Sequence, residues 1–318
     1  MGKIYIHIGL HKTASTYMQE KVFPYVDGIF YVDRFYTQLN TAFNSLQFSD
    51  DSSYDPNLLK NELEKIKIAA KGRPILISDE ALSGCPLWGG GNRGIIAQRL
   101  AAVIPEAEII IFMRDQVDLI LSLYNQYLKQ GWFSGPLDKD FLWRPGDGVQ
   151  FGDWVSGDRK WNTDNLRFNP GSVISPYTFK YSEIINLYES NFQKTFLFLY
   201  EEFVVNQSDV IDKLMNVMGV VAPSLVAVPE SRVNASLSER HLHRSLIGNR
   251  LNSLGLPHRG MLNRVLVRLL GPCIKKQSLD ERRKYVSEVL SEYGVFDDNR
   301  SVNEDFSLEM DKHAGKYF

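Results

Sequence analysis

Short apolar runs alternate along the chain with segments whose apolar residues recur every three or four positions. The apolar runs occupy residues 3–8, 74–78, 107–113 and 195–200, with a weaker run at 28–32. Continuous apolar runs are typical of strands buried on both faces, as in a parallel sheet. The helical patterns occupy residues 15–23, 58–70, 93–103, 117–130, 181–190 and 210–218. This alternation predicts an α/β fold with helices on both faces of a parallel sheet.

The composition is that of an ordinary globular protein. The chain has 318 residues, with 36 Lys and Arg against 38 Asp and Glu, and 44% of its residues are hydrophobic. These values exclude disordered, collagen-like and coiled-coil chains, and the length suffices for a sizeable core. Because no run of about 18 apolar residues occurs and the N-terminal apolar run is too short for a signal peptide, we expect a cytoplasmic protein.

Positive charge is concentrated late in the chain. Between Arg232 and Lys284 there are twelve Lys and Arg against three Asp and Glu, a net charge of +9. Such a segment is either a solvated helical face or a surface for an anionic ligand or membrane. Within it, residues 262–270 form a basic amphipathic stretch that packs on the domain, lies on a membrane surface or contacts a partner. Nucleic-acid binding is not expected, because these charges belong to no recognised module.

Candidate chemistry begins directly after the first apolar run, where the chain reads GLHKTAST from Gly9 to Thr16. Parallel sheets bind ligands at the carboxyl ends of their strands, and a helix that starts there offers free N–H groups to an anion. The loop lacks the triphosphatase pattern G-x4-GK[ST], because Ala14 and Ser15 stand where that pattern has glycine and lysine. It therefore predicts an anion site of another kind.

A second anion-binding element follows the apolar run at 107–113. Arg114 ends this run, Asp115 is a plausible N-cap, and Ser122 lies about two turns into the next helix. The planar guanidinium of Arg114 suits a phosphate, and Ser122 adds a hydroxyl donor.

Together the two elements resemble the donor site of sulfotransferases that use 3′-phosphoadenosine 5′-phosphosulfate (PAPS), in particular the bacterial carbohydrate sulfotransferases. The loop is similar to the family's 5′-phosphosulfate loop, GxxKTGTT, and residues 114–122 are similar to its 3′-phosphate element. Residues 77–84 and 196–220 resemble two less specific segments of the family and occur in the same order along the chain.

The resemblance implies a P-loop NTPase-like three-layer sandwich with a central parallel sheet, in a single sulfotransferase domain over residues 1–318. In this domain, residues 131–169 would form an acceptor-binding insertion, and residues 222–318 a mostly helical C-terminal part. The implied reaction moves a sulfuryl group from PAPS to a hydroxyl or amine, leaves adenosine 3′,5′-bisphosphate, and needs no metal. The implied acceptor is a carbohydrate or another small molecule.

The resemblance also assigns the donor-binding residues. They are Gly9, Lys12, Thr13, Ala14, Ser15, Thr16, Arg114, Ser122, Arg232, Asn234 and Ser236. Lys12 is expected to be catalytic as well, by neutralising the leaving phosphate. Ala14 replaces a family glycine, a change that costs stability only if the backbone there needs a positive φ or a very close approach to the phosphate.

An acceptor hydroxyl needs a base, because its pKa lies far above 7. Glu80 is the first choice, since it follows a buried strand and similar enzymes often use a glutamate. His11 is the second choice, although it would equally position the donor. Two alternatives stay open: Glu80 is only a capping or ion-paired carboxylate, or Asp79 points inward instead.

The acceptor is assigned to the segment 131–169, which is long for a connection and rich in aromatic and basic residues. Its candidate substrate-binding residues are Trp132, Trp143, Trp154, Arg159 and Trp161. The alternative is that these tryptophans pack a satellite cluster under the loop.

Two other functions compete with sulfuryl transfer. One is an ATP-dependent phosphotransferase of P-loop type, and the other is a non-catalytic protein that binds a nucleotide or an anionic glycan. The sequence leaves the oligomeric state open.

Overall fold

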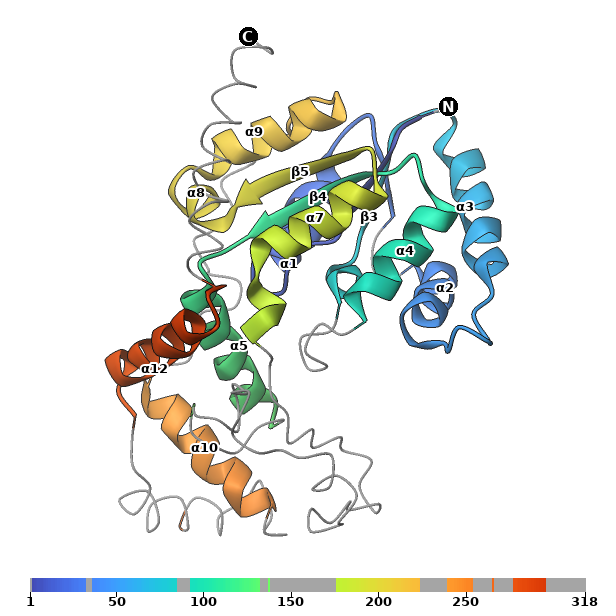
Figure 1. Cartoon of the computed structure of the whole chain (residues 1–318). Coiled ribbons are helices and arrows are strands. Elements are labelled where there is room, and N and C mark those ends of the chain that lie inside the picture. Colours follow the sequence, from blue (N-terminus) through green and yellow to red (C-terminus); the bar gives the residue numbers. More distant parts are fainter. Residues whose placement is uncertain are drawn as a thin grey trace. The chain divides into compact units, whose positions relative to one another are not determined.

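The computed structural model describes residues 2–32, 36–84, 92–131, 137, 176–223, 239–253, 265 and 277–295. The chain divides into two compact units, which are described separately below (Figure 1). The first unit comprises Met1–Pro86, Gly90–Leu119 and Tyr181–Ala235, and the second comprises Leu87–Gly89, Ile120–Lys180 and Ser236–Phe318. The assignment of the whole chain to a single sulfotransferase domain stays a prediction.

A five-stranded parallel sheet forms the centre of the first unit. Its strands are β1 (Ile4–His7), β2 (Phe30–Val32), β3 (Ile75–Ser78), β4 (Glu108–Met113) and β5 (Lys194–Leu199). Four of the five lie within the apolar runs of the sequence, and β5 begins one residue before its run. The strand order is β2-β3-β1-β4-β5. The chain therefore leaves β1 toward one edge of the sheet and leaves β4 toward the other, and ligands bind where neighbouring parallel strands diverge in this way.

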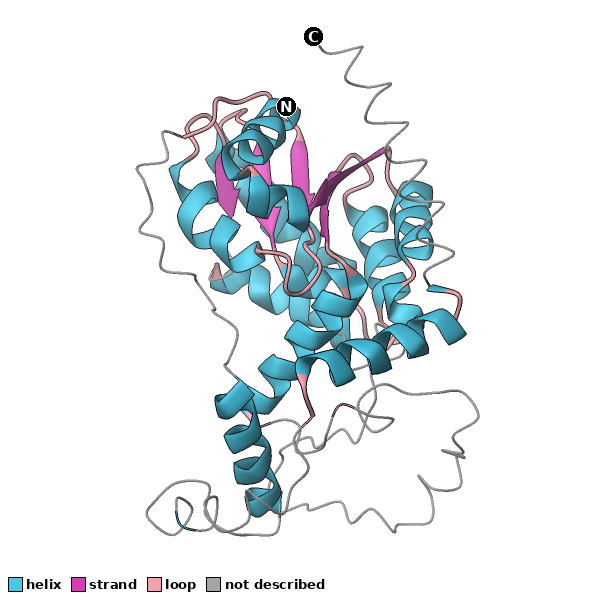
Figure 2. Cartoon of the chain, turned by 90° about the vertical axis from the view of Figure 1, so that its left-hand side faces the viewer, coloured by secondary structure: helices cyan, strands magenta, loops and turns pink. Residues whose placement is uncertain are grey.

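Helices cover both faces of this sheet (Figure 2). Ile4 and Ile6 of β1 pack on one face, and Tyr5 between them packs on the other, as the two-residue period of a strand requires. The first face is covered by α2 (Thr37–Phe48), α3 (Pro56–Ala70), α4 (Arg93–Val103) and α7 (Tyr181–Asn191). The second face is covered by the helical segment that follows β1 and by α8 (Tyr200–Val205) and α9 (Gln207–Met218). The predicted α/β three-layer sandwich is thus confirmed.

The helical pattern at 15–23 forms three short pieces instead of one regular helix. They are α1 (Ser15–Tyr17), the π-helix η1 (Met18–Val22) and the 3₁₀ helix η2 (Phe23–Tyr25). Pro24 lacks a backbone donor, which contributes to ending the regular turns here. Single π turns inside helices are frequent at functional sites, and this one carries the buried Gln19.

Helix α2 was not predicted from the sequence. Its core residues Leu39, Ala42, Phe43 and Leu46 have the spacing of one helix face, but polar residues separate them. The other predicted helices are confirmed to within a few residues of their ends.

The described part of the second unit is helical. It contains the end of α5 (Gln116–Gln130), the short η5 (Pro176–Phe179), α10 (Glu239–Ser253) and α12 (Leu279–Glu292). Asn249 Nδ2 of α10 donates to the carbonyl of Leu128 at 2.8 Å. Helix α12 begins with a capping box, in which Ser278 and Glu281 each accept a hydrogen bond from the other's backbone N–H. None of the helices described here is long and apolar enough to cross a membrane.

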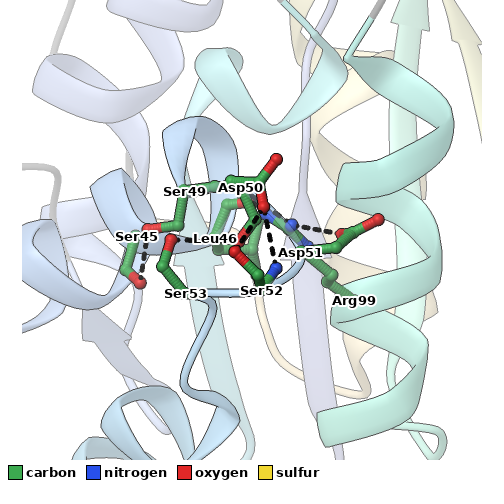
Figure 3. A network of polar contacts seen from close by, with 8 residues as sticks. All are labelled: Ser45, Leu46, Ser49, Asp50, Asp51, Ser52, Ser53 and Arg99. Atoms are coloured by element: carbon green, nitrogen blue, oxygen red, sulfur yellow. Dashed lines mark hydrogen bonds and ion pairs between the residues drawn. The ribbon is translucent and has the colours of Figure 1, made fainter.

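A buried arginine joins α4 to the segment between α2 and α3 (Figure 3). Arg99 is only 7% exposed, and its guanidinium donates to the carbonyls of Leu46 at 2.8 Å and Ser49 at 2.9 Å. It also pairs with Asp51 at 2.5 Å and lies over the ring of Tyr54. One side chain therefore satisfies two carbonyls and packs against an aromatic face at a chain reversal.

We expect Arg99→Ala to lower the free energy of unfolding by about 3 kcal/mol, because two carbonyls lose charged donors and the buried stem leaves a cavity. The matched control is Lys60→Ala on the exposed side of α3, which should change stability by less than about 0.5 kcal/mol. Urea unfolding followed by circular dichroism measures both. A loss below about 1 kcal/mol for Arg99→Ala would contradict this role.

Candidate active site

The loop that follows β1 lies between the carboxyl ends of β3 and β4. His7, the last residue of β1, pairs with Ser78 of β3 on one side and with Ile110 of β4 on the other. The pairing continues one step into the loop, where Ile8 N–H donates to the carbonyl of Ile110 at 3.1 Å. The ends of three strands thus surround the residues predicted to bind an anion.

The loop backbone alternates in handedness. Lys12 and Ala14 have φ values of 67° and 68°, while Thr13 between them is not among the residues with positive φ. Alternation of this kind turns successive backbone N–H groups toward the same side and makes a concave anion-binding surface. Ala14 occupies a conformation that favours glycine, which is the residue found there in the usual sulfotransferase loop. The alanine therefore costs stability at this position.

The hydroxyl side chains of the loop differ in their contacts. Thr13 is fully buried, and its Oγ1 donates to the carbonyl of Leu10 at 2.5 Å, so this hydroxyl closes the loop and leaves only its backbone N–H for an anion. Ser15 is 2% exposed, and its Oγ has no hydrogen-bond partner among the described residues. Thr16 is half-buried in the first turn of the helical segment.

Arg114 reaches from the end of β4 to this loop. Its Nη1 donates to the carbonyl of Lys12 at 2.9 Å, and its guanidinium lies over the ring of Tyr200, 4.4 Å from the centroid. Its Nε is buried without a partner among the described residues. Tyr181 fixes the backbone of Arg114, because its hydroxyl donates to the Arg114 carbonyl and accepts from the Arg114 N–H. Burial raises the pKa of Tyr181, so the phenol keeps its proton.

Asp115 caps α5 as the sequence predicts. Its Oδ1 accepts from the N–H of Asp118 at 2.9 Å. Its own N–H donates to Glu201 Oε1 at 2.9 Å, which ties the start of α5 to α8. Ser122 is half-buried on α5 and belongs to the second unit, whereas Arg114 belongs to the first.

The two carboxylates after β3 have different positions. Asp79 Oδ1 accepts from the N–H of Ala81 at 2.9 Å and so caps η3 (Glu80–Ser83). Glu80 lies beside the loop, with its Oε1 3.9 Å from His11 Nδ1. Burial lowers the pKa of His11, and the negative charge of Glu80 partly offsets this effect. Capping is therefore done by Asp79, and Glu80 is paired with a loop histidine.

Sequence reasoning missed His7, Ser78 and Gln19. His7 is fully buried at the end of β1, and burial lowers its pKa to about 3, so the ring is neutral at pH 7. Its Nδ1 lies 2.7 Å from Ser78 Oγ. A polar residue in an otherwise apolar run is the signal that could have identified His7.

Several predicted site residues lie outside the described residues. They are Arg232, Asn234 and Ser236 for the donor, and Trp132, Trp143, Trp154, Arg159 and Trp161 for the acceptor. Their roles stay predictions.

Comparison with known proteins adds little to this geometry. No protein-family model matches the chain, and no curated protein matches it. Among solved structures, a sulfotransferase from Alicyclobacillus acidocaldarius is similar with 13% sequence identity over 83% of this chain and 99% of that chain, at a TM-score of 0.39. A likeness this loose carries no argument about the activity.

We expect Ala14→Gly to raise the free energy of unfolding by about 1 kcal/mol, because glycine adopts positive φ without a Cβ penalty. The matched control is Ala69→Gly on the exposed side of α3, where glycine should lower stability by about 1 kcal/mol. Chemical unfolding of both variants checks the difference in sign. A loss of stability at both positions would show that residue 14 does not need a left-handed conformation.

Proposed function

We propose that the protein is a PAPS-dependent sulfotransferase that moves a sulfuryl group to a hydroxyl or amine of a carbohydrate acceptor. The contact between Arg114 and the carbonyl of Lys12 is the observation that carries this proposal. The two segments that resemble the family's phosphate-binding elements are far apart in sequence, and this contact joins them at the carboxyl end of a parallel sheet. The buried and unpartnered Nε of Arg114 further supports an anionic ligand.

In this proposal, the loop binds the 5′-phosphosulfate group of PAPS. Backbone N–H groups from Thr13 to Thr16 hold its oxygens, and Lys12 stabilises the charge that develops on the leaving phosphate. Arg114 and Ser122 bind the 3′-phosphate, and the segment with Arg232, Asn234 and Ser236 covers the nucleotide. The insertion 131–169 binds the acceptor through its tryptophans and Arg159.

The chemical step forms a bond from the acceptor oxygen or nitrogen to sulfur and breaks the bond from sulfur to the bridging oxygen of PAPS. The electron pair of the broken bond stays on the 5′-phosphate of adenosine 3′,5′-bisphosphate, and the acceptor proton goes to a base. Positioning and charge stabilisation carry most of the catalysis, as in phosphoryl transfer.

Glu80 and His11 are the candidates for this base. Their separation of 3.9 Å makes them a pair. If His11 takes the proton, the negative charge of Glu80 stabilises the imidazolium that forms; if Glu80 takes it, the carboxylate becomes neutral. The lowered pKa of His11 favours a neutral imidazole at pH 7, which is the form that accepts a proton.

The donor site is tested by calorimetric titration with adenosine 3′,5′-bisphosphate, in parallel with Mg-ATP. We expect tight binding of the bisphosphate and at least about tenfold weaker binding after Lys12→Ala or Arg114→Ala, because each change removes a charged hydrogen bond to a phosphate. Ligand at about 100 times its Kd should also raise the free energy of unfolding by about 2.7 kcal/mol.

Lys60→Ala is the control for this titration, since it removes an exposed lysine of α3 that belongs to no predicted site. Its Kd should equal that of the unmodified protein. Preference for Mg-ATP would favour the phosphotransferase instead, and no binding of either nucleotide would overturn the donor site.

The catalytic pair is tested by transfer of labelled sulfuryl from PAPS to a panel of monosaccharides and oligosaccharides. We expect Glu80→Gln and His11→Asn to lower turnover by about 100-fold or more while the Kd for the bisphosphate stays within about threefold. Glu64→Gln on the exposed face of α3 is the matched control and should leave both values unchanged. Bisphosphate binding without turnover by the unmodified protein would favour the non-catalytic alternative.

A further inference from the structure

A chain of buried polar side chains lies behind the loop. Gln19 is 5% exposed in the π-helix η1, and its Nε2 donates to Ser78 Oγ at 3.1 Å and to the Ser78 carbonyl at 3.4 Å. Ser78 Oγ in turn lies 2.7 Å from His7 Nδ1. The chain therefore runs from the π-helix across the end of β3 to the end of β1.

The donor and acceptor atoms of these side chains restrict the directions of the hydrogen bonds. The Ser78 carbonyl only accepts, so the amide nitrogen of Gln19 must face it, and the same nitrogen donates to Ser78 Oγ. Ser78 Oγ then keeps one lone pair and its own hydrogen, so its contact with His7 Nδ1 fits either tautomer of the ring. The lowered pKa of His7 keeps the ring neutral, so one of its two nitrogens carries the hydrogen.

Nε2 of His7 lies next to the loop. A Cβ built on Gly9 would lie 3.2 Å from His7 Nε2 and 2.4 Å from Ser15 Oγ, so both atoms lie close to this glycine and leave no room for a side chain there. Both atoms are buried, and neither has a hydrogen-bond partner among the described residues. They are thus near the same point but are not bonded to each other.

We propose that His7 is a positioning residue that orients the Ser15 hydroxyl toward the bound anion. In this role the Ser78 hydroxyl donates to His7 Nδ1, the ring carries its hydrogen on Nε2, and that hydrogen is directed at a lone pair of Ser15 Oγ when the anion is bound. The Ser15 hydroxyl hydrogen then points into the loop. This role rests on the proposed function, because the acceptor of that hydrogen is an oxygen of the 5′-phosphate or phosphosulfate group. When the direction of a buried hydroxyl is fixed before binding, the free-energy cost of orienting it toward the anion is lower than for a hydroxyl that must reorient.

A double-mutant cycle on the Kd for adenosine 3′,5′-bisphosphate tests this role. We expect Ser15→Ala and His7→Asn each to weaken binding by about tenfold, and the double variant also by about tenfold instead of 100-fold, since both changes remove the same hydrogen bond. Multiplicative losses would mean that His7 acts independently of Ser15 and would overturn the role.

His7→Gln is the matched rescue variant. A glutamine amide reaches about as far as histidine Nε2, whereas an asparagine amide reaches only as far as Nδ1. We therefore expect His7→Gln to bind within about threefold of the unmodified protein. Equal losses in the Gln and Asn variants would indicate a packing role only.

A second measurement uses the unmodified protein and no variant. Nitrogen-15 NMR of the histidine rings at pH 7 should show His7 as the neutral Nε2–H tautomer, with an Nε2 signal that shifts on addition of the bisphosphate. The Nδ1–H tautomer would overturn the role of His7 while leaving the donor site intact. Absence of bisphosphate binding by the unmodified protein would instead overturn the proposed function itself, so the two failures are distinguishable.

Discussion

The pairing of β1 with β3 on one side and β4 on the other is the constraint on which the site depends. Because the three strands are parallel and in register, the residues that follow them emerge at one edge of the sheet. The loop from Gly9 therefore meets Glu80 after β3 and Arg114 after β4, although these residues are far apart in sequence. The central position of β1 also requires apolar residues on both of its faces.

The polar groups and the strained backbone that suit this sheet edge to an anion lower the stability of the fold. His7 and Ser15 are both buried, and Ala14 has a left-handed backbone that alanine disfavours. By contrast, Arg99 and Tyr181 bond carbonyls of the chain, so their polar groups stabilise the first unit. Buried groups without a partner in the described part of the chain also occur away from the loop, for example Tyr54 and Thr195, but those of His7, Ser15 and Arg114 lie together at the carboxyl ends of β1 and β4.

Much of this fold could be predicted from the sequence, because central strands of a parallel sheet are largely apolar, and each strand coincides with an apolar run to within a few residues. The loop and Arg114 were found for a similar reason, since each directly follows a buried strand. Helix α2 was missed although Leu39, Ala42, Phe43 and Leu46 recur with helical spacing, so its signal was present in the sequence. The chain from Gln19 to His7 could not be predicted, because it depends on a π turn and on strand register, neither of which leaves a periodic signal.

Charge is divided across the loop in a way that suits the proposed transfer. The guanidinium of Arg114, which follows β4, donates to the backbone carbonyl of Lys12. Glu80, which follows β3, lies beside His11 of the loop. In an in-line transfer, negative charge grows on the leaving phosphate as a proton leaves the acceptor, so cations and the base must serve opposite ends of the reacting group. The parallel sheet provides part of this separation, because Glu80 follows β3 and Arg114 follows β4, on opposite sides of β1. Under the proposed function, Lys12 in the loop serves the leaving phosphate, Arg114 binds the 3′-phosphate of the same donor, and Glu80 or His11 takes the acceptor proton.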